Sequence, residues 1–440
     1  MAIALKKRRI ITAKIEATRG TAEVPVASSD AIPMIRDATF EITPVEVERP
    51  TLRLSLTDYP DIYPGKALVR ARILAEVAGR DSGFPASEPN WTRLLRACGM
   101  RFADQASNVF AYKVTALTTN NGALRHGEVV SGTALAGTGN TMLGDNFAQE
   151  GAQFTTVFVA EGATPGTGAG TITSQRGSSE TVMTVTTRST NKCLAWIPQS
   201  DVNSQSTVSI GLYLDGKLCA LKGAMGNVEY QFNHGDACLA QFDMQGVLVS
   251  YSDQAMPTNA FEGHKVPPTF LGSRLTLSSP INLPGNSDRY GTGGTAGFGT
   301  KGSLNQVRLS SGNNVVLQPN SLDPDGVSFA LVTSRKPAGS FNPTEVLSAS
   351  EFDFISRFVA GSPARMKLLL GATDHTNPNS ADQNTFEFMA PGIVFSGMTD
   401  ADRDGINIWD ASFELSGGDY DSTALGEAPG NDNEFILVHR

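Results

Sequence analysis

The sequence predicts a mainly β protein made of two similar β-sandwich or barrel units, each with a short flanking helix, and a small inserted β domain. Three observations lead to this prediction. Many short segments alternate apolar and polar residues with the period of two that β-strands show. The 440 residues include 44 glycines and 23 prolines but only 18% charged residues, a composition typical of loop-rich β proteins. The order of the segments also occurs twice along the chain.

The clearest strand signal lies in residues 208–232. Alternate residues from Val208 to Leu214 are apolar, as in a half-buried strand. Asp215 and Gly216 then supply the positive φ angles of a tight two-residue hairpin turn. We therefore expect consecutive antiparallel strands here, in a segment that carries no evident nucleophile or metal ligand.

The first series of elements begins with a strand near residues 38–44 and a polar loop at 55–66. A second strand follows at 67–79, with Val69, Ala71, Ile73, Ala75 and Val77 on one face and Arg70 and Arg72 on the other. A short helix comes next, because apolar residues then recur at helical spacing before a glycine that can end the helix. These residues are Trp91, Leu94, Leu95 and Cys98, followed by Gly99.

A second series repeats this order. It consists of two strands within residues 303–319, a polar loop at 320–326, an extended segment at 335–347, a helix at 348–361, and strands at 364–372, 384–397 and 406–415. In the helix, Ser350 is expected at the N-cap, Ile355 and Val359 on the inward face, and Gly361 at the end. The repetition lies in the order of the elements and not in residue identity.

Residues 113–190 interrupt the first series. They are rich in Gly, Thr, Ser and Ala and contain short alternating runs. They lie between two segments that would otherwise be consecutive strands, and a surface loop accepts an insertion at low entropic cost. We therefore divide the chain into residues 1–112 plus 191–265 as the first unit, 113–190 as an inserted β-rich surface domain, and 266–440 as the second unit.

Composition and charge restrict the possible partners. The net charge is −9, and only residues 6–9 form a basic run, which argues against a nucleic-acid reader. No apolar run approaches the roughly 18 residues that span a bilayer, so no membrane partner is expected. The first twenty residues lack the order of a secretory signal, and we expect synthesis and folding in a cytoplasm.

The residues that resemble known chemical sites are better explained as structural. The four cysteines (Cys98, Cys193, Cys219 and Cys238) have no metal-binding spacing and are predicted as core residues. The glycine-rich segment from Gly291 lacks the strand and helix of a nucleotide site. Asp400, Asp402 and Asp404 begin like a calcium loop, but no glutamate stands at its last ligand position. We therefore predict a protein that is not an enzyme and that has no cofactor and no metal.

Five segments together resemble the tail tube (major tail) proteins of long-tailed bacteriophages and prophages. They are "LKKRRIITAKIEATRGT" near the start, "LLRACGM", "LYLDGKLCALKGAMGNVEYQF", "SRKPAGSF" and the late "MTDADRDGINIWDASFEL". The resemblance covers most of the chain outside residues 113–190, and it implies tail-tube-type β-sandwich units. It also implies a structural subunit of the virion tail, whose stacked rings surround a lumen that conducts DNA and holds the tape measure protein before ejection.

The resemblance defines the expected partners. These are other copies of the chain, the tape measure protein, the tail terminator and tail-tip proteins, and double-stranded DNA that passes without being held. Two units per chain favour a trimer with pseudo-sixfold symmetry, while a hexamer remains possible. If each of about six units gave four strands, the resulting barrel would be about 48 Å wide, enough for a duplex.

The polar loops are the candidates for contacts between rings, since exposed loops are available for such contacts. The candidate residues are Asp58, Tyr59, Asp61, Ile62, Tyr63, Asp323 and Asp325. Arg70 and Arg72 are expected at subunit contacts, because arginines that lined a DNA channel would need acidic partners. The alternative function is that of a β-sandwich carbohydrate-binding adhesin or spike protein. A nucleotide-using enzyme built on the Gly291 segment is the weakest alternative.

Overall fold

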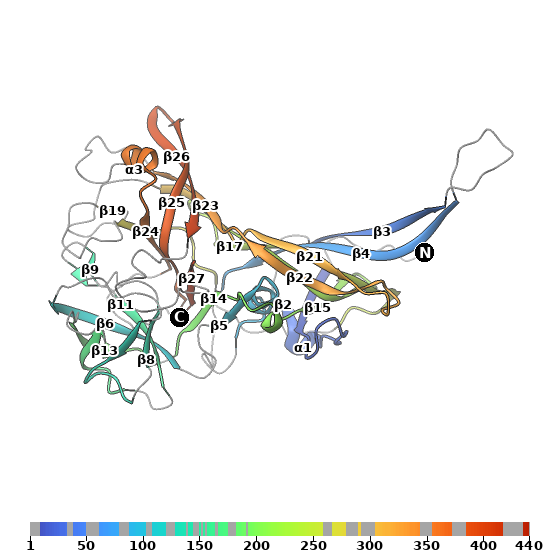
Figure 1. Cartoon of the computed structure of the whole chain (residues 1–440), viewed down its shortest axis with the longest axis horizontal. Helices are drawn as coiled ribbons and strands as arrows, with labels where there is room; N and C mark the ends of the chain where they lie inside the picture. The colour runs from blue at the N-terminus through green and yellow to red at the C-terminus, as the bar shows by residue number, and fades with distance from the viewer. Residues whose placement is uncertain are drawn as a thin grey trace.

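A computed structural model describes most of the chain. The residues described are 9–32, 38–49, 61–78, 88–102, 108–119, 128–137, 140–143, 149–150, 153–154, 156–162, 166–174, 182–190, 192–257, 266–278, 289–291, 304–343, 354–371, 384–416 and 434–439. Of these residues, 65% are in strands and 7% in helices, so the protein is mainly β, as predicted. Figure 1 shows an elongated molecule, with a long hairpin arm at one end and a body of sheets at the other.

The first series of strands forms one continuous antiparallel arrangement. In chain order its elements are β1 (Arg9–Ile15), β3 (Thr39–Arg49), β4 (Asp61–Glu76), helix α2 (Thr92–Ala97), β15 (Val208–Leu214), β16 (Lys217–Asn233) and β17 (Leu239–Asp253). In the sheet the strands lie in the order β1-β15-β16-β17-β4-β3. The residues predicted on the apolar face of β4 are all buried, which confirms that strand.

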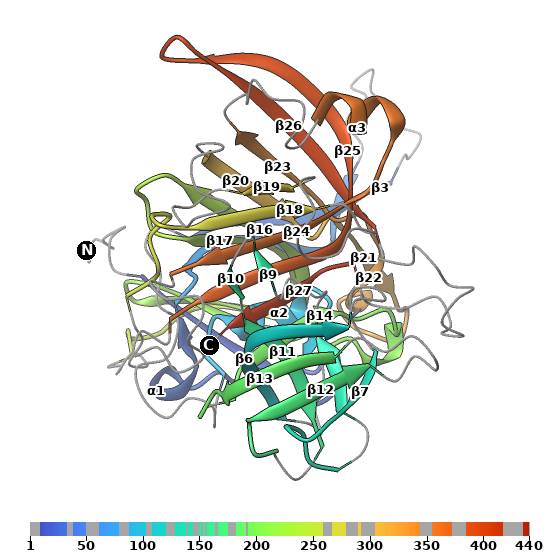
Figure 2. The ribbon, with the colours of Figure 1, turned by 90° about the vertical axis from the view of Figure 1, so that its left-hand side faces the viewer.

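The second series has the same strand order. Its elements are β18 (Arg274–Ser278), β20 (Leu304–Ser310), β23 (Ala338–Pro343), helix α3 (Phe354–Ala360), β24 (Ala364–Leu370), β25 (Phe386–Arg403) and β26 (Ile406–Ser416). They pair antiparallel in the order β18-β24-β25-β26-β23-β20. When the strands of each series are numbered along the chain, both orders are 1-4-5-6-3-2, with the helix between the third and fourth strands. Figure 2 looks onto the strands of this region, with the β25–β26 hairpin projecting above them.

Shorter elements complete the main sheet and its surroundings. They are helix α1 (Ala27–Asp30), β2 (Ala31–Ile32), β5 (Met100–Phe102), β14 (Leu194–Pro198), the 3-10 turn η1 (Val202–Ser204), β19 (Arg289–Gly291) and β27 (Ile436–His439). β14 bridges β5 and β27, and β27 pairs with β25. A separate hairpin, β21 (Asn313–Pro319) with β22 (Val327–Arg335), lies outside this sheet.

A six-stranded barrel lies below the sheets in Figure 2. Its strands are β6 (Asn108–Thr119), β7 (Val129–Ser131), β8 (Asn140–Leu143), β11 (Thr156–Glu161), β12 (Gly170–Ser174) and β13 (Val182–Arg188), beside a short pair, β9 (Gln149–Glu150) with β10 (Gln153–Phe154). The chain enters and leaves the barrel at adjacent points, because the Ser189 N–H donates to the Ala111 carbonyl at 2.8 Å and the Cys193 N–H donates to that of Val109 at 2.8 Å.

One hydrophobic core extends through both series of strands, from Ile11 and Leu95 to Phe388 and Phe413. A second core fills the barrel. A third cluster joins the two, because Leu143 and Phe158 of the barrel pack with Ile436 and neighbouring residues of the main sheet. The barrel is therefore docked on the body through apolar contacts as well as connected to it by the chain.

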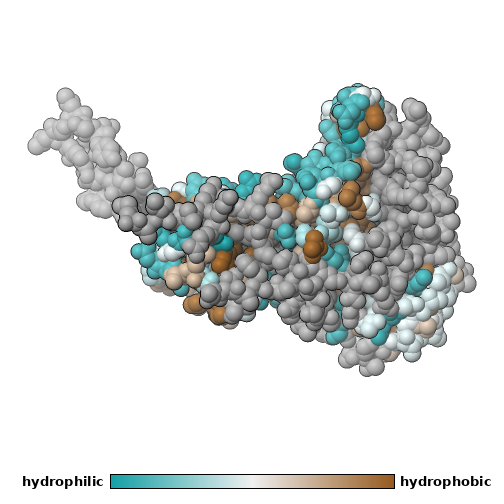
Figure 3. Space-filling view, turned by 180° about the vertical axis from the view of Figure 1, so that it is seen from behind, coloured by the Kyte–Doolittle hydropathy of each residue, from teal (hydrophilic) through white to brown (hydrophobic). Residues whose placement is uncertain are grey.

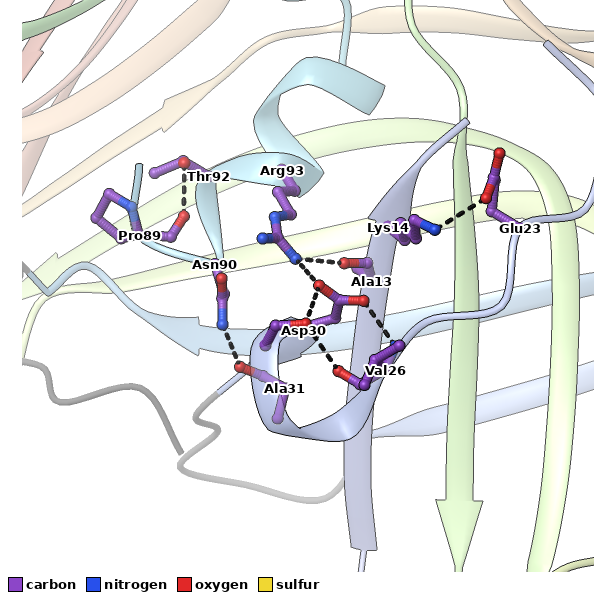
Figure 4. Close-up of polar contacts among 11 residues, drawn as sticks. Ala13, Lys14, Glu23, Val26, Asp30, Ala31, Pro89, Asn90, Thr92 and Arg93 are labelled. Carbon is purple, nitrogen blue, oxygen red and sulfur yellow. Dashed lines mark hydrogen bonds and ion pairs between the residues drawn. The ribbon is translucent and has the colours of Figure 1, made fainter. Parts of the chain in front are cut away.

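Helix α2 matches its prediction. Leu94, Leu95 and Cys98 are buried, and Gly99 follows with a φ of 70°. Polar contacts fix the helix on the first strand, as Figure 4 shows: Arg93 Nη1 lies 3.1 Å from the Ala13 carbonyl oxygen and 2.7 Å from Asp30 Oδ1. The helix thus holds β1 and α1 together.

The inward face predicted for helix α3 is wrong. Ile355 is 40% exposed and Val359 79% exposed, whereas Phe354 is buried and Phe358 packs against the core. The two phenylalanines have the same spacing as the two aliphatic residues, and they bury more surface. Gly361 ends the helix as predicted, with a φ of 60°. Ser350 lies outside the described residues.

Two Asp-Gly pairs form tight hairpin turns. Asp215 and Gly216 have φ values of 40° and 99°, as predicted, and Asp404 and Gly405 have φ values of 53° and 81°. The aspartate-rich segment considered as a calcium loop is therefore the end of β25 and its turn. The four cysteines are buried, and none of them forms a disulfide bond. Among the helices described, none is long and apolar enough to cross a membrane.

Candidate functional site: strand junctions and free sheet edges

The two series of strands meet edge to edge within the chain. β20 pairs with β23 on one edge and with the end of β16 on the other, where Glu229–Asn233 lie antiparallel to Gln306–Ser310. The hydrogen-bonding edge of one series is therefore satisfied by a strand of the other. The contact between the series is a backbone junction, and not only a packing contact.

The β21–β22 hairpin strengthens this junction by lying over the first series. Ala330 and Val332 pack against Met225 of β16, with Val315 and Leu317 at the margin. Gly20 and Gly223 allow close approach, since a Cβ on either would lie within 3 Å of the hairpin backbone. Both glycines have positive φ values, so their conformation also favours glycine.

Where the hairpin lies on the sheet, side chains form hydrogen bonds with its backbone groups. Gln205 donates from Nε2 to the Val332 carbonyl at 3.0 Å and accepts from the Val332 N–H at 3.1 Å. Asn227 likewise donates from Nδ2 to the Asn313 carbonyl at 2.8 Å and accepts at Oδ1 from the Asn313 N–H at 2.5 Å. Asn313 in turn donates from its own Nδ2 to the Cys98 carbonyl at 2.7 Å.

Asp323 and Asp325, two of the predicted contact residues, lie in the β21–β22 turn and face the same chain. Lys222 Nζ lies 2.9 Å from Asp325 Oδ2 and 3.7 Å from Asp323 Oδ1. The hydrogen bond to Asp325 is the largest cause of a raised Lys222 pKa. These carboxylates therefore fix the hairpin tip on β16, and a role between rings stays a prediction.

The other predicted contact residues belong to the β3–β4 hairpin. Asp58 and Tyr59 lie outside the described residues, while Asp61, Ile62 and Tyr63 pair through their backbones with the end of β3. Figure 1 shows that this arm and the β21–β22 hairpin extend toward the same end of the molecule. The hairpins that carry the two predicted loops thus point toward the same end of the molecule.

Among the described residues, β3 and the end of β25 each have an edge without a strand partner, as do the shorter strands β2, β5 and β19 and the two strands of the β21–β22 hairpin. β3 pairs with β4 on one edge only. β25 pairs with β26 from Gly397 to Asp402, and β24 covers its other edge only as far as Ile393. Exposed edges of this kind present unsatisfied N–H and C=O groups and are templates for pairing with another chain.

Arg70 and Arg72 lie on the exposed face of β4, opposite the core. Arg72 Nε lies 3.7 Å from Asp243 Oδ1, and its Nη2 donates to Gln241 Oε1 at 2.8 Å. Arg72 therefore has the acidic partner that an arginine facing DNA would need. Whether either arginine lies at a subunit contact stays a prediction.

The buried ionisable groups of the barrel form a structural cluster. Glu161 is fully buried, accepts from the Gly166 N–H at 2.6 Å, and lies 3.7 Å from Arg188. Tyr112 donates its hydroxyl to Glu161, and burial, with this hydrogen bond, raises the pKa of Tyr112. The carboxylate is thus enclosed by protein donors. No group of three or more potential metal ligands occurs in the part of the chain described.

Sequence reasoning missed the residues that build the junction, above all Gln205, Asn227 and Asn313. Asn227 and Asn313 stand in strands, where polar residues usually face solvent, and Gln205 stands just after η1, so none of the three gives a sign of its partner in the sequence. The one usable signal was Gly312, since a glycine between two strand-like segments indicates a change of direction. Its φ of 58° marks the bend between β20 and β21.

Comparison of the sequence with protein-family models gives no match, and comparison with curated proteins gives none either.

Proposed function

We propose that the chain is a structural, non-enzymatic subunit of a tail tube of the kind found in long-tailed bacteriophages and prophages. Copies of the chain close into rings, and the rings stack around a lumen that holds the tape measure protein and then conducts DNA. The tail terminator and tail-tip proteins would bind the two ends of the tube. The alternative, a carbohydrate-binding adhesin, gains no support from a row of exposed aromatic residues, because Tyr251 is the only aromatic residue among the large exposed hydrophobic residues described.

The observation that carries the proposal is the repeated strand order, 1-4-5-6-3-2, joined edge to edge by the pairing of β16 with β20. If the two series are tail-tube-type units, one chain supplies two units already in lateral contact, and three chains would close a pseudo-sixfold ring. The strand edges that remain open would be satisfied when the ring closes, since a closed ring leaves no free edge. In this proposal the barrel of residues 108–188 is the inserted surface domain.

The charges of the sheet are compatible with passive DNA transport. A conduit must not hold DNA, because each phosphate neutralised by Lys or Arg adds affinity that has to be broken during passage. The pairing of Arg72 with Asp243 lowers the attraction that this face of β4 would have for phosphate. An acidic or neutral bore would keep the duplex centred.

The stacking role of the hairpin loops remains part of the proposal. Tyr59, Ile62 and Tyr63 would be the apolar anchors, with Asp58, Asp61, Asp323 and Asp325 beside them. The double variant Tyr59→Ala with Ile62→Ala should give rings that do not polymerise. Tubes of normal length from this variant would exclude the anchoring role.

Electron microscopy of the purified chain tests the function directly. Rings or tubes with a central lumen are expected, with a trimer in each layer. A hexamer in each layer would contradict the duplicated arrangement and leave the tube function intact. Discrete monomers at high concentration would favour the adhesin.

A further inference from the structure

We propose that β3 of one copy pairs with the free edge of β25 in a second copy of this chain, repeating between copies the junction that β20 and β16 form within one. This inference rests on the proposed ring-forming function and adds which strands meet and in what register. The occupant of both open edges is thus the chain itself.

The two series of strands supply both halves of the missing junction. β3 and β20 are the second strands of their series, and β16 and β25 are the fifth strands. β20 is paired on both edges, whereas β3 is paired on one among the described residues. The end of β16 is likewise paired on both edges, whereas β25 has, within the part of the chain that the structure describes, one strand partner from Gly397 to Asp402.

The two open edges cannot meet within a single chain. In Figure 1 β3 runs along the arm at one end of the molecule, while the β25–β26 hairpin projects from the body at the other. Pairing therefore needs a second copy. Because each copy carries one edge of each kind, the contact is head to tail, the type of interface that closes rings.

A β-bulge in each series fixes the expected register. The pairing of β16 with β17 shifts between Ala220 and Leu221, with the extra residue on β17, and again between Lys222 and Met225, with the extra residue on β16. The second shift matches the one in β25 between Phe395 and Gly397, where the extra residue lies on β25. Bulges of this kind are specific features of a strand and mark equivalent positions. Met225 and Gly397, the first paired residues beyond the bulges, therefore correspond.

From this point the register follows by counting. Ala401 corresponds to Glu229, since each stands the same number of residues beyond its bulge. The strand pairing can then be followed from β17 through β4 to β3 in the first series, and from β26 through β23 to β20 in the second. Along these two paths Thr43 of β3 stands at the position that Ser310 has in β20. Glu229 pairs with Ser310 within the chain, so Ala401 should face Thr43 of the next copy.

The chemistry of the two edges suits a contact made by backbone groups. The same register sets Arg403 opposite Glu41, a pair of opposite charge on facing strands. Figure 3 shows the projecting β25–β26 hairpin, at the top of the view, as largely hydrophilic. An antiparallel strand contact needs no apolar patch, because main-chain hydrogen bonds supply the affinity.

In the contact between copies, the outer half of the β3–β4 hairpin would have the role that the β21–β22 hairpin has within one chain. That hairpin continues β20 and β23 and lies over the first series of its own chain. The outer half of the β3–β4 hairpin continues β3 and β4 in the same way. It would therefore lie over the β25–β26 sheet of the neighbouring copy.

Disulfide cross-linking tests the register. The double variant Thr43→Cys with Ala401→Cys should form intermolecular disulfides on mild oxidation, because directly opposed strand residues lie within reach of a disulfide. A ladder on a non-reducing gel, ending at the covalent trimer, is expected. The four native cysteines are buried and give little background.

The matched control moves one cysteine by a single residue. Thr43→Cys with Asp402→Cys places the second thiol on the opposite face of the strand, and cross-linking should be about tenfold slower. Mixing the two single variants, Thr43→Cys and Ala401→Cys, should give dimers only. Sedimentation and electron microscopy of the same samples report ring formation independently.

Rings that form without the Thr43–Ala401 cross-link, or with equal cross-linking in the control, overturn this inference and leave the proposed function standing. A chain that stays monomeric and does not cross-link overturns both.

Discussion

The side chain of Asn227 in β16 hydrogen-bonds to both backbone groups of Asn313 at the start of β21, as a neighbouring strand would. Its amide nitrogen donates to the Asn313 carbonyl at 2.8 Å, and its oxygen accepts from the Asn313 N–H at 2.5 Å. This exchange occurs where the chain leaves β20 and turns over the first series of strands. Asn227 therefore guides the hairpin at the point where the two series meet.

Replacement of Asn227 by alanine should lower the free energy of unfolding by about 1–3 kcal/mol, because backbone groups of Asn313 lose their partners. Denaturant unfolding measures the change. Asn314→Ala is the matched control, since Asn314 is exposed and bonds only to the neighbouring strand of its own hairpin. Equal effects from the two variants would contradict the role given to Asn227.

Gly312→Ala should prevent the bend between β20 and β21. A Cβ on Gly312 would lie 1.9 Å from the Lys336 carbonyl oxygen, and the φ of 58° is unfavourable for alanine. Gly405→Ala meets only the second cost, about 1 kcal/mol, because no atom lies within 4 Å of its Cβ position. We expect a loss of thermal stability several times larger for Gly312→Ala, measured by calorimetry.

Glu16→Gln should destabilise the contact between the first strand and β15–β16. The buried carboxylate accepts four hydrogen bonds, from the Gly20 and Gly223 N–H groups and from the hydroxyls of Thr207 and Ser209. An amide accepts only through its oxygen, so one backbone N–H, of Gly20 or of Gly223, loses its partner at about 1–3 kcal/mol, while the hydroxyl on the same side can turn to accept from the amide nitrogen. The control is Glu23→Gln, which removes an ion pair of partly exposed groups with Lys14 and should have little effect.

His439 should make the folded state sensitive to mild acid. Burial lowers its pKa from 6.5 to about 4, so the folded state binds a proton less readily than the unfolded state. Its contribution is complete above pH 6.5 and is lost as the pH falls toward 4, by up to about 3 kcal/mol. The variant His439→Phe should show a shallower fall of unfolding free energy over this interval. A parallel pH dependence in both proteins would refute the assignment.

Deletion of the insertion, with Lys113 joined to Lys192 by a short linker so that residues 114–191 are removed, should preserve ring formation. The strand edges proposed for assembly lie elsewhere. The thermal midpoint should nevertheless fall, because the contacts of Leu143 and Phe158 with the main sheet are lost. Electron microscopy and calorimetry report the two effects separately. A folded variant that forms no rings would place the barrel in the ring wall or in the contact between rings.

Local patterns sufficed for much of the fold. Alternation identified the buried face of β4 from Val69 to Val77, helical spacing identified Leu94 and Leu95, and an Asp-Gly pair identified the turn at Asp215. These features depend on neighbours in sequence, which the sequence displays. Helix α3 was different, because Phe354 with Phe358 and Ile355 with Val359 have the same spacing, and only the shape of the core selects the aromatic pair.

The junction itself could not be predicted. Asn227 and Asn313 are far apart in the chain, and each looks like an ordinary solvent-facing strand residue. The ion pairs of Lys222 with Asp323 and Asp325 are equally non-local. The contact of this polar loop with Lys222 has no local signature in the sequence, and the predicted role of the loop between rings stays a prediction.

The covalent link between the two series also has a kinetic consequence in the proposed ring. The β16–β20 junction forms within one molecule, at an effective concentration set by the connecting chain, and it costs no translational freedom of a second subunit. Only alternate junctions around a pseudo-sixfold ring would then require collision of separate molecules. Ring closure should therefore depend less steeply on protein concentration than the closure of a ring built from single-unit chains.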